Sequence, residues 1–117
     1  MTTDVGMKFD FGEALKRLKD GKAVRRGCWV SLQKCVYLNK GSFPPNLQGV
    51  TRLGWVDSKH FELGDTGTLV RMPNLNLNSD TGVIVSGWAP SQIEMLAEDW
   101  MSVQDTTTAD KPKKIEG

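Results

Sequence analysis

The stretch that decides the fold is GWAPSQIEMLAEDWMSV, residues 87–103. Ser91 and Glu94 stand three residues apart, the spacing of a capping box in which each side chain accepts a hydrogen bond from the other residue's amide. Apolar residues follow at the i, i+3, i+4 and i+7 positions of one helix face: Ile93, Leu96, Ala97 and Trp100. Trp88 before the cap and Trp100 after the helix are expected to fix both ends of this short helix onto a sheet.

A second helix is predicted near the start of the chain, over residues 10–20. Asp10 and Glu13 repeat the capping-box spacing. Apolar side chains then follow with helical periodicity at Phe11, Ala14, Leu15 and Leu18. Basic residues in the last turn, and Gly21 just beyond it, are typical of a helix end.

Short strands and turns account for the rest of the chain. β-Rich or alternating residues predict strands at 23–26, 34–38, 69–78, 83–85 and 100–103. Pro73 indicates an interruption or a sheet edge early in the third of these. Loops are predicted at 27–33 and 39–49, the second because adjacent prolines do not lie inside a central strand. Residues 79–82 read as a turn, and residues 50–63 as an irregular segment with one possible strand.

These elements predict an α+β fold, with a small antiparallel β-sheet and two short helices packed on it. The 117 residues suffice for a single domain, placed at 9–103 after a flexible N-terminus at 1–8. Residues 104–117 are polar, lack large aromatic side chains and are predicted to form a disordered tail. A domain of this size buries a modest core, so oligomerisation is a natural way to bury more.

The composition argues against several functional classes. A formal net charge of +1 does not suit a protein that coats a nucleic-acid polymer. No apolar run approaches 18 residues, so no membrane association is expected. Cys28 and Cys35 match no metal or redox spacing, and His60 is the only histidine. We therefore expect no metal site, no cofactor and no enzymatic activity.

Binding chemistry is better represented. Arg25 and Arg26 lie on a predicted strand beside Trp29, and an arginine fork suits a phosphate while an aromatic plane suits a purine base. Strand residues alternate sides, so only one of the two arginines can share a face with a given pocket. Three asparagines on one strand face either read a base edge or ribose, or simply face solvent: Asn74, Asn76 and Asn78.

Two segments resemble the signatures of the Thoeris anti-defence 2 family of phage proteins. The C-terminal signature is carried by Trp88, Ser91, Gln92, Met95, Leu96, Glu98, Asp99 and Trp100. The N-terminal signature is carried by Phe11, Gly12, Glu13, Ala14, Leu15, Leu18, Gly21, Val24, Arg26, Gly27 and Trp29. The chain departs from the family where Cys28 separates Gly27 from Trp29, and where Asn74 and Asn76 stand in place of a frequent His and Asp.

The resemblance implies a protein of the host bacterial cytoplasm that binds nucleotide immune signals and sequesters them without cleaving them. The ligands implied are cyclic ADP-ribose isomers of Thoeris systems and cyclic oligonucleotides of cyclic-oligonucleotide-based systems (CBASS). They are expected at subunit interfaces of a homotetramer. The expected ligand-binding residues are Arg25, Arg26, Trp29, Phe43 in the loop at 39–49, Asn74, Asn76, Trp88 and Ser91.

Two other functional classes remain open at this point. A phage structural protein or host-protein-binding accessory protein would dock through Trp55, Phe61 and the loop that contains Pro44 and Pro45. A small nucleic-acid binder would use the basic residues of the first helix, for which a solvated face is the simpler interpretation.

Overall fold

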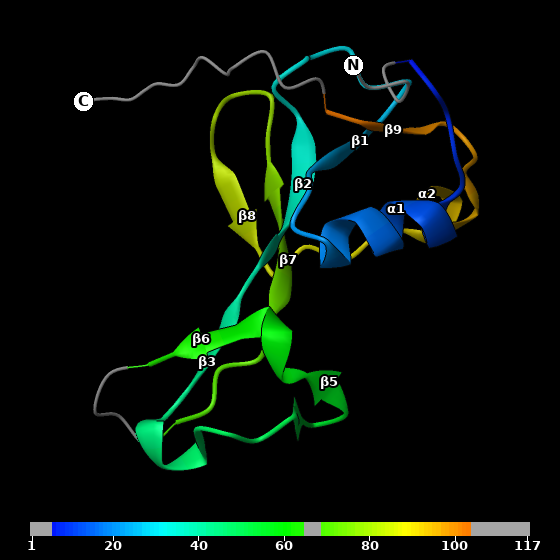
Figure 1. Ribbon diagram of the computed structural model, residues 1–117. Helices are drawn as coiled ribbons and strands as arrows, with labels where there is room; N and C mark the ends of the chain where they lie inside the picture. Colours follow the sequence, from blue (N-terminus) through cyan, green and yellow to red (C-terminus); the bar gives the residue numbers. More distant parts are fainter. Residues whose placement is uncertain (1–5, 65–68, 104–117) are drawn as a thin grey trace.

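The computed structural model describes residues 6–64 and 69–103. Its centre is a five-stranded sheet with the order β8-β7-β2-β1-β9 (Figure 1). The strands are β1 Val24–Arg26, β2 Cys35–Asn39, β7 Asn74–Asn78, β8 Ile84–Ser86 and β9 Trp100–Ser102. All neighbouring strands are antiparallel, which confirms the predicted antiparallel sheet of an α+β fold.

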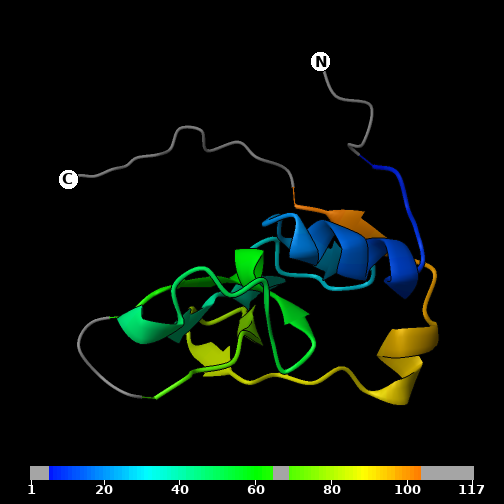
Figure 2. The ribbon, with the colours of Figure 1, turned by 60° about the horizontal axis from the view of Figure 1, so that its bottom comes forward.

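Helix α1, Phe11–Lys19, matches the prediction. The Asp10 side chain caps it by accepting a hydrogen bond from the Glu13 amide at 2.9 Å. The helix lies on β1, β2 and β9 (Figure 2). Its inner face places Ala14 and Leu18 in full burial, so the amphipathic pattern of the sequence is used as expected.

The core is small and is centred on Trp100, whose side chain is fully buried. Its other fully buried members are Ala14, Leu18, Val24 and Val36. The Phe11 and Trp29 rings contact Trp100 with centroid distances of 5.3 and 5.7 Å. The indole Nε1 donates to the Glu94 carbonyl at 2.9 Å, so the one polar atom of this side chain is satisfied inside the core.

Helix α2, Gln92–Leu96, has both halves of the predicted capping box. The predicted apolar face is wrong in part, because Ile93 and Leu96 are 77% and 79% exposed. The helix ends after five residues, where Ala97 turns to an extended backbone with ψ of 150°. Ala97 and Trp100 therefore leave the helical periodicity and reach the core by a different path. Only α1 lies across the sheet as predicted for both helices.

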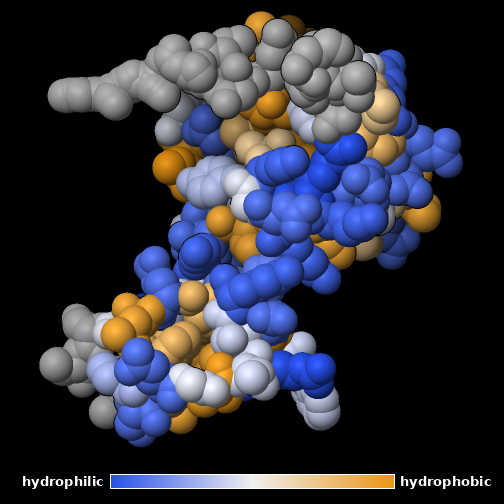
Figure 3. All heavy atoms as spheres, viewed as in Figure 1, coloured by the Kyte–Doolittle hydropathy of each residue, from blue (hydrophilic) through white to orange (hydrophobic). Residues whose placement is uncertain are grey.

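Residues 41–72 include a second, smaller lobe below the main sheet, beyond a narrower waist (Figures 1 and 3). The loop predicted at 39–49 is wrong in part, since Gly41–Phe43 forms strand β3, paired in parallel with β6, Phe61–Leu63. The prolines follow β3 and begin a 3₁₀ helix at Pro45–Leu47, so they do not interrupt the strand. The segment read as irregular contributes β4 Arg52–Leu53, β5 Val56–Asp57 and a 3₁₀ helix at Ser58–His60.

Strands β2 and β7 run on past their neighbours β1 and β8 as a two-stranded ribbon that joins the lobe to the main sheet. Strands β2 and β7 pair over their full length, from Cys35 opposite Asn78 to Asn39 opposite Asn74. Beyond them, the Ser42 amide donates to the Arg71 carbonyl at 2.8 Å and the Arg71 amide returns the bond at 2.8 Å. The strand predicted at 69–78 is thus shortened to β7 with one isolated bridge before it, and Pro73 lies at the interruption.

Strand β9 ends at Ser102, one residue before the described residues end. Within those residues, no helix is long and apolar enough to cross a membrane. The tail predicted at 104–117 and most of the flexible segment predicted at 1–8 lie outside the described residues.

The ribbon predicts a strict requirement for glycine at position 41. A Cβ at Gly41 would lie 2.1 Å from the Arg71 carbonyl oxygen and 2.8 Å from the Pro73 nitrogen, both backbone atoms. Gly41→Ala should lower the free energy of unfolding by at least about 1–3 kcal/mol, because the two backbone segments must move apart to admit the methyl group. In Gly12→Ala, the added Cβ meets only the Asp10 carboxylate at 3.4 Å, and this helical control should gain up to about 1 kcal/mol. Urea denaturation measures both, and equal midpoints would contradict the prediction.

Candidate ligand-binding site

The face of the sheet opposite α1 is polar. Val24 pairs with Val36, and both side chains are buried on the face that α1 covers. Because successive strand residues alternate sides, the residues next to them in β1, β2, β7 and β8 share the opposite face. We call this surface the polar face and define it by its polar members, Arg25, Cys35, Tyr37, Asn76, Asn78 and Ser86, beside which Ile84 lies opposite Asn78.

Two side chains of the polar face are buried with polar atoms that lack a partner. Arg25 is 8% exposed and Asn76 is 6% exposed. Arg25 donates from Nη2 to the Trp29 carbonyl and from Nε to the Arg26 carbonyl, the second at 3.4 Å. Arg25 Nη1 and Asn76 Oδ1 have no hydrogen-bond partner among the described residues. A buried donor or acceptor left unpaired costs about 1–3 kcal/mol, so this arrangement is costly unless another molecule satisfies it.

The strand between these two residues supplies the centre of the polar face. Tyr37 lies directly opposite Asn76, and Cys35 lies opposite Asn78. Burial raises the pKa of the Cys35 thiol, so this group stays neutral near neutral pH. The polar face thus places a donor from Arg25 and an acceptor from Asn76 on either side of one strand that carries a phenol ring.

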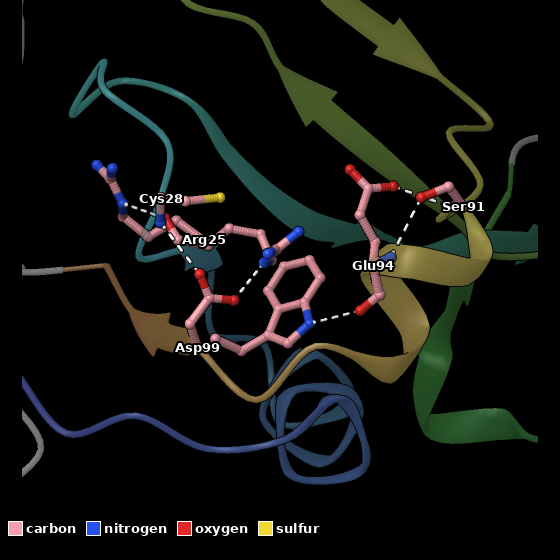
Figure 4. Close-up of polar contacts among 7 residues, drawn as sticks. Arg25, Cys28, Ser91, Glu94 and Asp99 are labelled. Atoms are coloured by element: carbon pink, nitrogen blue, oxygen red, sulfur yellow. Dashed lines mark hydrogen bonds and ion pairs between the residues drawn. The ribbon is translucent and has the colours of Figure 1, made fainter.

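Arg26 points to the face opposite Arg25 and forms an ion pair with Asp99 through its Nε. The second Asp99 oxygen accepts from the Cys28 amide at 3.2 Å, and the Asp99 carbonyl accepts from the Gly27 amide at 2.7 Å. Figure 4 shows Asp99 beside Cys28, away from the Ser91–Glu94 capping box. The bond from Arg26 lowers the pKa of Asp99 and raises that of Arg26. The Cys28 backbone, which separates Gly27 from Trp29, is therefore tied to Asp99, the residue before β9.

The two tryptophans expected to bind ligand pack against the core. The Trp29 ring meets Trp100 edge-on at an interplanar angle of 77°, and the Lys34 ammonium lies 4.7 Å from the Trp29 centroid. Trp88 packs on the same core, and its amide donates to the Leu75 carbonyl at 2.8 Å. Both side chains are half-buried, which leaves part of each ring open to another molecule.

The remaining expected site residues lie apart from one another. Phe43 packs against Phe61 in the second lobe, with ring centroids 6.3 Å apart. Ser91 is occupied in the capping box of α2. Asn74 shares the strand face of Asn76, and its Oδ1 accepts from the Gly87 amide at 3.3 Å. Within one protomer, the structure therefore places Arg25, Asn74 and Asn76 on one face of the sheet, and it does not bring the full expected set together.

Sequence reasoning missed three residues of this region. Cys35 and Tyr37 join the polar face because they alternate with buried Val36, a signal that the sequence contained. Asp99 lies 73 residues from its partner Arg26, and no sequence spacing indicates that pair. In the described part of the chain, no three His, Cys, Asp or Glu side chains gather as metal ligands.

The Arg26–Asp99 pair predicts a pH-dependent stability. The pKa of Asp99 is lower in the folded protein, so its carboxylate stabilises the fold above the unfolded-state pKa of about 3.9, and this contribution disappears as the pH falls through the lower folded value. Asp99→Asn should lose about 1.5–3 kcal/mol at pH 7, the range for hydrogen bonds to charged groups. Below pH 4 the deficit relative to the parent should shrink.

Glu98→Gln is the matched control, because this substitution removes the same charge from an exposed side chain next to Asp99. Urea denaturation at neutral and acidic pH measures both variants. An Asp99→Asn deficit that persists unchanged in acid, or a Glu98→Gln deficit of equal size, would show that the pair does not act as described.

The family comparison agrees with this architecture. A family model described as the Thoeris anti-defense 2-like domain matches residues 9–103, which span α1, both lobes and β9. The match covers both signature segments and the strands between them. No curated protein sequence matches the chain. The chain belongs to the Thoeris anti-defense 2-like family.

Proposed function

We propose that this protein counters bacterial immunity by binding nucleotide signals and sequestering them without cleavage. The signals are cyclic ADP-ribose isomers, cyclic oligonucleotides, or both. The family membership supports the anti-defence role against Thoeris systems. The observation that carries the ligand class is the polar face, where Arg25 Nη1 and Asn76 Oδ1 are buried and unpartnered.

The two unpartnered atoms have the chemistry that a nucleotide needs. Arg25 Nη1 offers a charged donor to a phosphate or ribose oxygen, and such charge-assisted bonds are about twice as strong as neutral ones. Asn76 Oδ1 offers an acceptor to an exocyclic amine or a hydroxyl group. Arg25 is already held by the Trp29 and Arg26 carbonyls, so it loses little conformational freedom when a ligand binds.

One aromatic side chain of this face supplies stacking surface. Tyr37 lies beside Asn76 on the polar face, whereas Trp29 and Trp88 pack on the core on the α1 side of the sheet and keep part of their rings open there. Stacking of one base on an aromatic ring contributes about 1–3 kcal/mol. A sequestering protein must bind its signal more tightly than the signal's receptor does, and a nanomolar dissociation constant corresponds to about −12 kcal/mol.

The groups that the polar face presents support retention rather than cleavage. Arg25, Tyr37 and Asn76 provide charge, hydrogen bonds and a ring, while His60 is buried in the second lobe. Cys35 is a neutral thiol and is therefore a poor nucleophile. The protein acts in the host bacterial cytoplasm as a homotetramer whose subunits together complete the ligand pockets.

One observation favours a second candidate, docking to a host protein. Trp55 is 87% exposed and adopts a φ of 65°, at the tip of the β4–β5 hairpin beside Gly54. A bulky residue with positive φ is strained, and such strain often marks a functional position. Phe61 does not belong to this surface because it is buried.

Replacement of Asn76 separates a ligand-binding role from a structural one. Asn76→Leu keeps a similar volume and removes the unpartnered Oδ1, so the free energy of unfolding should stay constant or rise by about 1–3 kcal/mol. Nucleotide affinity measured by calorimetry should fall at least tenfold. Asn78→Leu is the control on the same strand face, and it should lose stability because Asn78 Nδ2 donates to the Gln33 carbonyl at 3.1 Å.

Recovery of the ligand tests the absence of cleavage. The protein is incubated with a panel of cyclic ADP-ribose isomers and cyclic dinucleotides, filtered, and then heated to release what it holds. We expect intact nucleotide in the released fraction. Linearised or hydrolysed product would show an enzyme, and no binding to any member of the panel would favour the docking protein.

A further inference from the structure

The two edges of the five-stranded sheet differ. At the β9 edge, the Phe9 amide donates to the Trp100 carbonyl at 2.9 Å and the Trp100 amide donates to the Phe9 carbonyl at 3.0 Å, so this edge is partly covered. At the other edge, no described segment pairs with the outer side of β8 (Figure 1). The β8 edge therefore presents unpaired backbone groups, which template pairing with another strand.

The sequence of β8 lacks the features that usually protect an edge. Residues 83–87 read Val-Ile-Val-Ser-Gly, with no charge and no proline. Val83, Ile84 and Val85 are all exposed, and Ile84 and Val85 point to opposite faces of the sheet. Covering an apolar, uncharged edge of this kind with another strand removes apolar surface from water and is therefore favourable.

The pairing of β8 with β7 fixes which backbone groups face outward. The Ser79 amide donates to the Val83 carbonyl at 2.9 Å, and bonded pairs alternate along an antiparallel ladder. Val85 is therefore bonded to Leu77, its partner in the register. The N–H and C=O groups of Ile84 and Ser86 consequently point away from β7, toward the open edge.

We propose that β8 pairs antiparallel with β8 of a second copy of this chain, about a two-fold axis at Val85. In this register Ile84 of each copy faces Ser86 of the other, and all the outward groups of these residues form four hydrogen bonds. Val85 faces its own counterpart in a non-hydrogen-bonded pair, for which the Cα atoms are about 4.5 Å apart. A second copy is the fitting occupant because the donors, acceptors and apolar side chains of β8 are self-complementary in this register.

The pairing has a consequence for the polar face. A two-fold axis perpendicular to the sheet keeps the α1 faces of both copies on one side and their polar faces on the other. Ser86, which lies opposite Asn76, then adjoins Ile84 of the second copy. This inference rests on the homo-oligomer of the proposed function, and it names one contact that makes the polar face continuous between subunits.

Disulfide trapping tests the register. In a Cys28→Ser, Cys35→Ser background, Val85→Cys should form a covalent dimer under mild oxidation, because its Cα separation lies within the disulfide range of about 4.4–6.8 Å. Val83→Cys is the matched control on the same exposed edge. The register separates its two copies by four residues along the strand, roughly 13 Å, so it should not cross-link. No dimer from Val85→Cys, or equal yields from both variants, would overturn the proposal.

A charge at the axis supplies the second measurement. Val85→Lys places two ammonium groups opposite each other, and its sedimentation should shift to a smaller species while its circular dichroism spectrum shows that the fold is kept. Leu32→Lys adds the same charge to an exposed loop and should sediment like the parent. If Val85→Lys keeps the parent's assembly, β8 is not the contact.

The same variants distinguish this proposal from the proposed function. Calorimetry with the nucleotide panel on the parent protein measures binding separately from assembly. A trapped Val85→Cys dimer, together with a parent protein that binds no nucleotide, would refute sequestration and leave the β8 contact intact. A protein that binds nucleotide without cross-linking at Val85 would refute the β8 contact and leave sequestration intact.

Discussion

The burial of Trp100 is the constraint on which the rest of the structure depends. The ring fills the space between α1 and the sheet, and its Nε1 needs an acceptor inside the core. Glu94 supplies that acceptor from the backbone of α2, so one hydrogen bond sets where the short helix lies relative to β9. The capping box of α2 then uses the Glu94 side chain for a different purpose, and one residue serves both the start of a helix and the centre of the core.

Local patterns predicted the parts of this fold whose causes are local. Capping spacing located both helices, and β-rich or alternating residues located the five strands of the main sheet, although β7 begins at Asn74 rather than at the predicted residue 69. The exposed Ile93 and Leu96 show where periodicity fails, because it does not reveal that a backbone leaves the helix after five residues. The second lobe was missed for a related reason. Its strands are two or three residues long and pair across distant segments, and such short pieces carry no periodic signal.

The candidate site shows the same division between local and distant causes. Alternation alone requires Arg25 and Arg26 to point to opposite faces, and it also predicts that Asn74 and Asn76 share a face. Which arginine is held by a carboxylate was not predictable, since Asp99 reaches Arg26 through the pairing of β1 with β9. Burial of Asn76 was equally hidden, because asparagine at alternate positions is typical of a solvated strand face. The family resemblance indicated the functional class, and the structure shows which polar atoms of the sheet are buried without a partner among the described residues.

The ribbon that joins the two lobes behaves mechanically as a lever arm. Its two-stranded part runs from Leu38 opposite Leu75, beyond the pairs that β2 and β7 make with β1 and β8, to the bridge between Ser42 and Arg71. Two-stranded ribbons twist more strongly than wider sheets, so a small rotation near Asn39 would move the exposed Trp55 through a much larger arc. A change in the ribbon's twist would therefore change the reach of the molecule and leave the core around Trp100 undisturbed.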